Sequence, residues 1–76
     1  MINKKIEIYS RPGCTWCDKA KTYLKNKATP FVEHIVGKDI IVEDVKVMFP
    51  GVTTLPIIVL DSVLIGGYAQ LIERIK

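Results

Sequence analysis

The sequence has 76 residues, with 11 basic and 8 acidic side chains, a formal net charge of +3 and 49% hydrophobic residues. This length is typical of one domain, so residues 1–76 are expected to fold as a unit, and the apolar content excludes a disordered chain. The apolar runs are far shorter than the roughly 20 residues that cross a bilayer, and the lysines are dispersed among acidic residues. We therefore expect neither a membrane nor a nucleic acid as a partner.

A strand and then a helix are predicted for the first third of the chain. The strand covers residues 5–9, where apolar and other side chains alternate, and Arg11-Pro12-Gly13 ends it. The helix covers residues 14–26, because three apolar side chains recur there at helical spacing. These side chains are Cys17, Ala20 and Leu24. Both cysteines are therefore expected in the first turn of this helix.

The middle of the chain predicts a second strand and a second helix. Residues 30–36 have the alternating pattern of a strand. In the next segment the run Ile40-Ile41-Val42 is β-branched and favours a strand, while the apolar residues that follow have helical spacing. We interpret residues 42–49 as a helix that is capped by Asp39 and ended by Pro50-Gly51.

Two strands and a helix are predicted for the last third. Residues 55–60 form a continuous apolar run, typical of a strand covered on both faces, and Asp61-Ser62 turns the chain into a strand over residues 63–65. Apolar side chains then recur at the spacing of an amphipathic helix over residues 68–75. The order β-α-β-α-β-β-α predicts an α/β fold, with a four-stranded mixed sheet flanked by three helices. Its first two strands are parallel and joined by a right-handed crossover.

Cys14 and Cys17 are the only cysteines of the sequence, and two residues separate them. A pair with this spacing at the start of a helix is typical of a dithiol redox site. A structural zinc site requires four ligands, whereas the sequence offers two Cys and one His, His34, so no metal is expected. No apolar leader follows Met1. We therefore expect a reducing, cytoplasmic location, where such a pair is catalytic rather than a permanent bridge.

Four motifs, in order along nearly the whole chain, carry a resemblance to a known family. They are Tyr9-Ser10-Arg11-Pro12-Gly13-Cys14-Thr15-Trp16-Cys17, then Thr53-Thr54-Leu55-Pro56, then Asp61 in the hairpin, then Ile65-Gly66-Gly67-Tyr68 followed by Gln70-Leu71. With these motifs the sequence resembles the glutaredoxin family, and most closely its short phage-type and bacterial dithiol members. The resemblance implies the thioredoxin fold.

The two cysteines are expected to have different roles. Free backbone N–H groups and the positive end of the helix dipole favour a thiolate at Cys14, so its pKa should lie below that of a free cysteine. Cys14 is therefore the predicted nucleophile, which forms a mixed disulfide with a substrate. Cys17 is the predicted resolving thiol, which attacks Cys14 and releases the reduced substrate.

The resemblance also implies glutathione as co-substrate and a groove that binds it. The groove residues would be Arg11, Trp16, Thr54, Leu55, Pro56, Gly67 and Tyr68. By resemblance, the backbone of Leu55 pairs with the cysteinyl part beside a cis Pro56, and Arg11 meets the glycyl carboxylate. The γ-glutamyl carboxylate would lie at Gly67 and the start of the last helix. The local sequence alone also allows Arg11 as a solvated cation and Pro56 as an edge-strand proline.

The expected function is that of a monomeric, glutathione-dependent thiol–disulfide oxidoreductase. It would reduce protein disulfides and glutathione mixed disulfides, and ribonucleotide reductase is among the clients that the resemblance implies. Two departures from the family keep alternatives open. Ala69 and Gln70 replace acidic residues that many members carry, and this change is expected to weaken glutathione binding. It leaves open the alternative that the protein is a redoxin that thioredoxin reductase reduces and that donates electrons to ribonucleotide reductase. Thr15 replaces a common proline, as in members that hold an iron–sulfur cluster between two chains.

Overall fold

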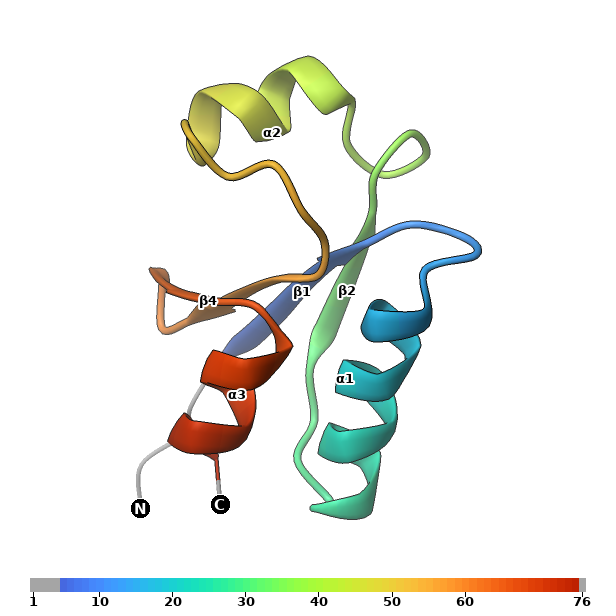
Figure 1. Cartoon of the computed structure of the whole chain (residues 1–76), viewed down its shortest axis with the longest axis vertical. Coiled ribbons are helices and arrows are strands. Elements are labelled where there is room, and N and C mark those ends of the chain that lie inside the picture. The colour runs from blue at the N-terminus through green and yellow to red at the C-terminus, as the bar shows by residue number, and fades with distance from the viewer. Residues whose placement is uncertain (1–4, 76) are drawn as a thin grey trace.

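The computed structural model describes residues 5–75, which form one sheet with helices against it (Figure 1). In chain order the elements are β1 (Ile6–Ser10), α1 (Thr15–Asn26), β2 (Val32–Ile35), α2 (Val42–Met48), β3 (Ile57–Leu60), β4 (Val63–Gly66) and α3 (Tyr68–Arg74). The predicted order of helices and strands is confirmed. Within residues 5–75 no helix has the length and apolarity needed to cross a bilayer.

The strands are arranged in the order β2-β1-β3-β4, with β1 parallel to β2 and antiparallel to β3, and β3 antiparallel to β4. The predicted mixed sheet is therefore confirmed. The central strand β3 is buried on both faces, as its unbroken apolar run predicts. Asp61 and Ser62, which connect β3 to β4, have φ values of 50° and 68°. Two successive positive φ values match the right-handed twist of the paired strands and allow a two-residue hairpin loop.

The strand ends differ by a few residues from the prediction. β2 covers Val32–Ile35 rather than residues 30–36, and Val36 makes only an isolated bridge with Ile40. β3 begins at Ile57 rather than at residue 55, after Pro56, which has no N–H to donate to a neighbouring strand.

The prediction that Asp39 caps the second helix is wrong. The N-cap of α2 is Ile41, and no side chain bonds to the helix start. Asp39 Oδ2 instead accepts the N–H of Ile35 at 2.9 Å, where β2 ends. A carboxylate satisfies a free backbone N–H at a strand end as well as one at a helix start, and here Asp39 bonds to the donor at the strand end.

The hydrophobic side chains form one cluster on each face of the sheet. The first cluster joins the sheet to α1 and α3, which pack against each other (Figure 1), and contains Ile6, Ile8, Ala20, Leu24, Ile58 and Leu71. The second cluster contains Tyr9, Val45, Ile57 and Val59. Val45 is the single buried residue of α2, whereas Val42 and Val47 on the same helix are 45% and 80% exposed. α2 therefore buries fewer side chains than α1, in which Cys17, Ala20 and Leu24 are all buried.

Candidate functional site

The candidate site lies where β1 passes into α1. The loop between them turns at Gly13, whose φ of 76° is readily adopted only by glycine, and delivers Cys14 to the N-cap position of α1. Cys14 Sγ accepts the N–H of Cys17 at 3.2 Å, a role that Ser, Thr, Asp or Asn usually fills at a helix start. Cys14 was predicted to lie in the first turn of the helix, but it lies one residue before it, at the N-cap. Its sulfur accepts one of the free backbone N–H groups at the start of α1.

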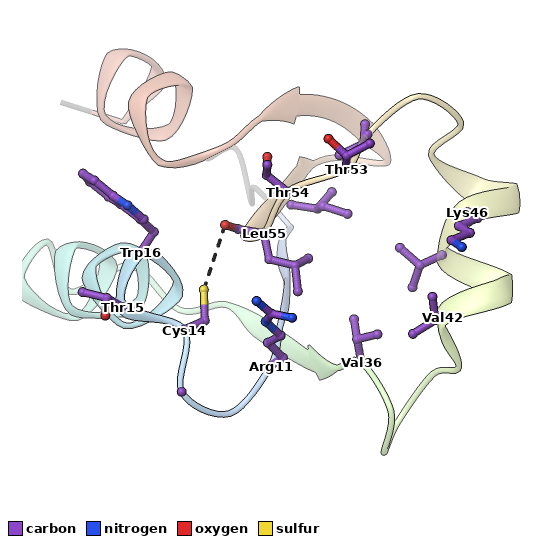
Figure 2. Close-up of a pocket in the computed structure, with 14 residues that line it drawn as sticks. Arg11, Cys14, Thr15, Trp16, Val36, Val42, Lys46, Thr53, Thr54 and Leu55 are labelled. Carbon is purple, nitrogen blue, oxygen red and sulfur yellow. Dashed lines mark hydrogen bonds between the residues drawn. The ribbon is translucent and has the colours of Figure 1, made fainter.

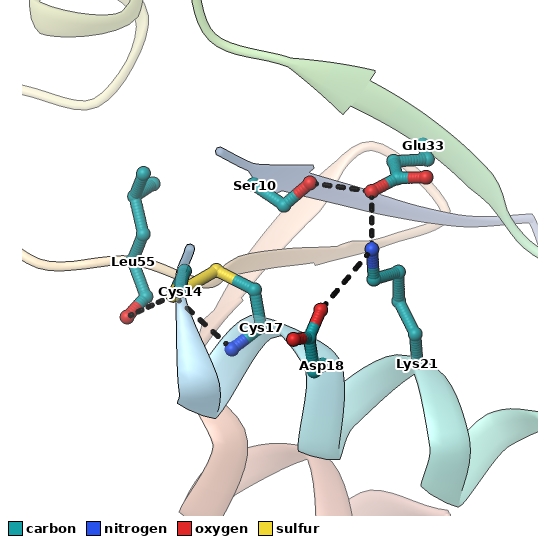
Figure 3. Close-up of a disulfide and its surroundings, with 7 residues drawn as sticks. All are labelled: Ser10, Cys14, Cys17, Asp18, Lys21, Glu33 and Leu55. Carbon is teal, nitrogen blue, oxygen red and sulfur yellow. Dashed lines mark hydrogen bonds and ion pairs between the residues drawn. A yellow bond between two sulfur atoms is a disulfide. The ribbon is translucent and has the colours of Figure 1, made fainter. Parts of the chain in front are cut away.

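The two cysteines are joined by a disulfide (Figure 3) and differ in exposure. Cys17 is completely buried against the sheet, while Cys14 is partly exposed at the surface. Only Cys14 can therefore meet a large substrate directly. After reduction, the Cys17 N–H and the start of α1 remain aimed at Cys14 Sγ and stabilise a thiolate there.

A second segment, distant in sequence, completes the surroundings of Cys14. Its sulfur lies 3.9 Å from the Leu55 carbonyl oxygen (Figure 2), which the thiol form of Cys14 can reach as a weak donor. The peptide bond between Leu55 and Pro56 is cis, as the resemblance implies. The segment before β3 therefore presents its backbone beside the reactive sulfur, where a substrate chain can pair with it.

The predicted groove residues are brought together around the disulfide. Arg11, Trp16, Thr54 and Leu55 line a cavity of about 750 Å³ that also contains Cys14 (Figure 2). Pro56, Gly67 and Tyr68 are not part of this lining but lie next to it. The Tyr68 ring is 5.5 Å from the ring of Trp16, and a side chain at Gly67 would come within 3.5 Å of the Pro56 carbonyl oxygen.

Gln70 has a role that the sequence reasoning missed. Its Oε1 accepts the N–H of Gly67 at 2.9 Å, so the side chain folds back over the start of α3. The γ-glutamyl carboxylate was predicted to lie in this region, at Gly67 and the start of the last helix. A helix-start residue followed three positions later by Gln is the pattern of a capping box, which could have predicted this bond.

The wall of the cavity opposite Cys14 was also missed. It is formed by α2, the loop after β2 and the segment before β3, and includes Val36, Val42, Val45, Lys46 and Val52. These side chains come from three separate segments, and no single stretch of sequence places them on one wall.

A polar network lies under α1 and fixes the helix that carries the cysteines (Figure 3). The buried Ser10 donates to Glu33 Oε2 at 2.6 Å, and Lys21 Nζ donates to the same oxygen at 2.8 Å. The bond from Lys21, followed by that from Ser10, holds the pKa of Glu33 below its usual value, and the pKa of Lys21 is raised by Glu33 in turn. The network therefore keeps its charges and connects α1 to both β1 and β2.

Replacing Glu33 with glutamine is expected to lower the free energy of unfolding by about 1 kcal/mol at neutral pH, because the charge that Lys21 binds is lost. A lowered pKa in the folded chain means that this contribution is present above the pKa of an unfolded glutamate. This contribution to stability disappears as the pH falls through the lower pKa that Glu33 has in the folded chain. Urea unfolding of both proteins across the acid range should show the difference closing, and the exposed Glu73→Gln serves as control. A difference that does not change with pH contradicts the ion pair as its cause.

His34 is paired within the structure rather than placed near the cysteines. Its Nε2 lies 3.0 Å from Glu7 Oε1, and its ring stacks on Tyr9 with 4.7 Å between the ring centres. Burial, and then the nearby Glu7, raise the pKa of Tyr9. Among residues 5–75, no three His, Cys, Asp or Glu side chains gather as a metal site would require.

Comparisons with known proteins agree with this geometry. The family model described as Glutaredoxin matches residues 6–65. Glutaredoxin 3 of Escherichia coli strain K12 is 32% identical over 62 residues, which are 82% of this chain and 75% of that protein. The hybrid peroxiredoxin hyPrx5 of Haemophilus influenzae is 36% identical over 66 residues, or 87% of this chain, but the chain spans only 27% of its length. The crystal structure of glutaredoxin 1 from Francisella tularensis, complexed with cacodylate, superposes with a TM-score of 0.75 at 26% identity, over 93% of this chain and 91% of that chain. With its redox-type cysteine pair, its sheet order and this family match, the chain belongs to the glutaredoxin family and has the thioredoxin fold.

Proposed function

We propose that this chain is a dithiol oxidoreductase that reduces protein disulfides and glutathione mixed disulfides, with glutathione as its reductant. The observation that carries the proposal is the asymmetry of the pair, in which Cys14 is accessible and held by the Cys17 N–H, while Cys17 is buried. The protein would act as a monomer in a reducing compartment such as the cytoplasm, since the reduced pair must be regenerated there.

The proposed reaction is two successive thiol–disulfide exchanges. The Cys14 thiolate attacks one sulfur of the client disulfide, and the other client sulfur leaves as a thiolate. The Cys17 thiolate then attacks Cys14 Sγ, so that the second client sulfur is released and the disulfide between Cys14 and Cys17 forms. Two glutathione molecules reduce this disulfide and leave as oxidised glutathione, which balances the two electrons given to the client.

Several groups near Cys14 are suited to glutathione. Arg11 lines the same cavity as Cys14 and can meet a carboxylate, and the Leu55 carbonyl lies beside Cys14 Sγ, where the backbone can pair with a cysteinyl residue. At the third predicted contact, Gly67 and the start of α3, the Gly67 N–H already bonds to Gln70. Glutathione is therefore proposed to bind with fewer contacts than the groove could offer.

The bond between Gln70 and Gly67 also favours a second candidate, in which thioredoxin reductase rather than glutathione reduces the pair. Two coupled assays on the same protein separate these candidates. Turnover with glutathione, glutathione reductase and NADPH supports the first proposal. Turnover that requires thioredoxin reductase, and does not occur with glutathione, replaces it with the second.

Replacing Gln70 with alanine is expected to lower the apparent KM for glutathione about fivefold, because the Gly67 N–H becomes free to bind a carboxylate. Glu73→Gln, an exposed change on the same helix, is the control, and its KM should equal that of the unchanged chain. The steady-state rate at varied glutathione measures both effects. An unchanged KM in Gln70→Ala would show that Gly67 takes no part in binding.

A further inference from the structure

A second surface runs along α1, from the predicted groove toward the end of the helix. Three aromatic rings form a row on it, because Tyr68 of α3 has its ring 5.5 Å from that of Trp16 and 6.5 Å from that of Tyr23. Lys19 Nζ lies 4.8 Å from the centre of the Trp16 ring. Lys27 Nζ lies 5.5 Å from the centre of the Tyr23 ring, so that an ammonium group covers each end of the row. We call these five residues the aromatic-lysine face.

The aromatic-lysine face is hollowed and lies beside the site already described. A second cavity, of about 400 Å³, is lined by both of its tyrosines, by Lys19 and by four other polar side chains of α1. Thr15 alone also lines the cavity that contains Cys14. In Figure 2 the Trp16 ring lies on the side of Cys14 away from α2. A partner seated on this face would therefore reach Cys14 from the side opposite α2.

The segment that carries this face holds the whole net charge of the chain. Residues 15–27 contain four lysines and one aspartate, a formal charge of +3, whereas the seven basic and seven acidic residues elsewhere cancel. Lys21 donates to Glu33, and the other three lysines of the segment are exposed. A positive potential is therefore concentrated along α1, where it attracts an acidic partner and speeds its approach.

The arrangement of the rings favours a protein partner over a membrane or a nucleic acid. The rings pack against one another, and the Tyr23 hydroxyl donates to the Ile75 carbonyl, so the aromatic side chains lie along the surface. Membrane insertion needs apolar side chains that project into the lipid, and stacking on bases needs a free ring face. Lysines cover faces of the two rings that α1 contributes. Aromatic surface within a polar rim is typical of protein interfaces.

We propose that the aromatic-lysine face binds an acidic segment of a protein client while the client's disulfide meets Cys14. The inference rests on the proposed function, because the contact serves a client only when its disulfide is also at Cys14. α1 rises about 1.5 Å per residue, so Lys27, at its end, lies roughly 20 Å from Cys14. An extended client chain covers this distance in about six residues. The acidic residues are therefore expected up to six positions from the client's reactive cysteine, beyond the length of glutathione.

Single-exchange kinetics with synthetic peptides test this proposal. Each peptide carries one cysteine as a mixed disulfide with thionitrobenzoate, and three glutamates or three serines at the fourth to sixth positions before or after it, in a background of Gly and Ser. In a Cys17→Ser chain, the Cys14 thiolate attacks the peptide sulfur, a disulfide to the peptide forms, and coloured thionitrobenzoate leaves with the electron pair. At low salt we expect the glutamates, on one side of the cysteine, to speed release about fivefold over serines, and salt at about 0.5 M to remove this advantage.

Three lysines provide matched charge reversals. Lys19 and Lys27 belong to the face, whereas Lys38 is exposed in the turn after β2. Lys19→Glu and Lys27→Glu should each reduce the glutamate advantage to about twofold or less. Lys38→Glu changes the net charge equally and should leave the advantage at about fivefold. Release from the serine peptides should be the same in all three variants, which checks that the fold and Cys14 are intact.

The possible outcomes separate the inference from the function on which it rests. Equal release from glutamate and serine peptides overturns the docking face and leaves the exchange reaction intact. Equal effects of Lys27→Glu and Lys38→Glu overturn it too, because the attraction would then come from net charge alone. Trp16 is the only tryptophan, so its fluorescence reports other partners. A response to phosphatidylserine vesicles or to single-stranded DNA that Lys27→Glu removes, in a chain without the glutamate advantage, replaces the client with a membrane or a nucleic acid. Absence of release from every peptide contradicts the proposed function and the inference together.

Discussion

Replacing Cys14 with serine should abolish disulfide exchange, with a loss of at least about a thousandfold in the rate of reduction of any disulfide. Serine fills nearly the same volume at the N-cap of α1 and can accept the Cys17 N–H, so the fold should be retained. Its hydroxyl is not ionised at neutral pH and cannot form the mixed disulfide on which both steps depend. Turnover with a small glutathione mixed disulfide and with a protein disulfide measures the loss.

The matched variant, Cys17→Ser, should separate the two substrates. Reduction of glutathione mixed disulfides should continue, because a second glutathione can attack the adduct at the accessible Cys14. Reduction of protein disulfides should fall by a factor of a hundred or more, roughly, because the buried resolving thiol is missing. Equal losses in the two variants for both substrates would contradict the roles assigned to the two cysteines.

Replacing Leu24 with alanine is expected to have the largest effect on stability. Leu24 is completely buried in the cluster that joins α1 and α3 to the sheet. Truncation of a buried leucine costs about 3 kcal/mol, from lost transfer free energy and from the cavity left behind. A chain of this length has a total stability of roughly 4–11 kcal/mol, so the variant should be close to unfolding at elevated temperature.

Urea unfolding under reducing conditions measures this effect, since the disulfide between Cys14 and Cys17 is then absent from every variant. Val47→Ala is the control, because Val47 is 80% exposed and its truncation should change stability by less than about 0.5 kcal/mol. A loss below about 1 kcal/mol for Leu24→Ala would mean that the cluster collapses around the missing side chain.

Most of the fold could be predicted from local patterns in the sequence. The apolar run of β3 predicts a strand covered on both faces, and the spacing of Cys17, Ala20 and Leu24 predicts the buried face of α1, all three being buried. These elements are determined by burial, which leaves a periodic pattern in the chain. The cap of α2 was mispredicted because Asp39 bonds to the backbone of Ile35 at the end of β2, and local sequence does not decide between a strand end and a helix start.

The candidate site was predicted less completely. The cysteines could be placed because their spacing reflects their chemistry, whereas Arg11 and Leu55, which line the same cavity, were placed by the resemblance to the family. The cavity wall opposite Cys14 could not be predicted, because its residues Val36, Val42 and Val52 lie on different segments. Only the three-dimensional path of the chain brings these side chains together. Each of these valines, taken alone, has the pattern of an ordinary core residue.

The weak attachment of α2 has a mechanical consequence. A helix whose single buried residue is Val45 should open locally at a lower free energy than α1, which buries Cys17, Ala20 and Leu24. The part of the cavity wall that α2 forms should therefore be more compliant than α1 and β3, which follow directly on the segments that carry Cys14 and Leu55. A compliant wall beside a rigid reactive centre can adjust to side chains of different sizes without disturbing the alignment of the sulfur atoms. The protein would then accept clients with different side chains beside their reactive cysteine, because one short helix can move to fit them.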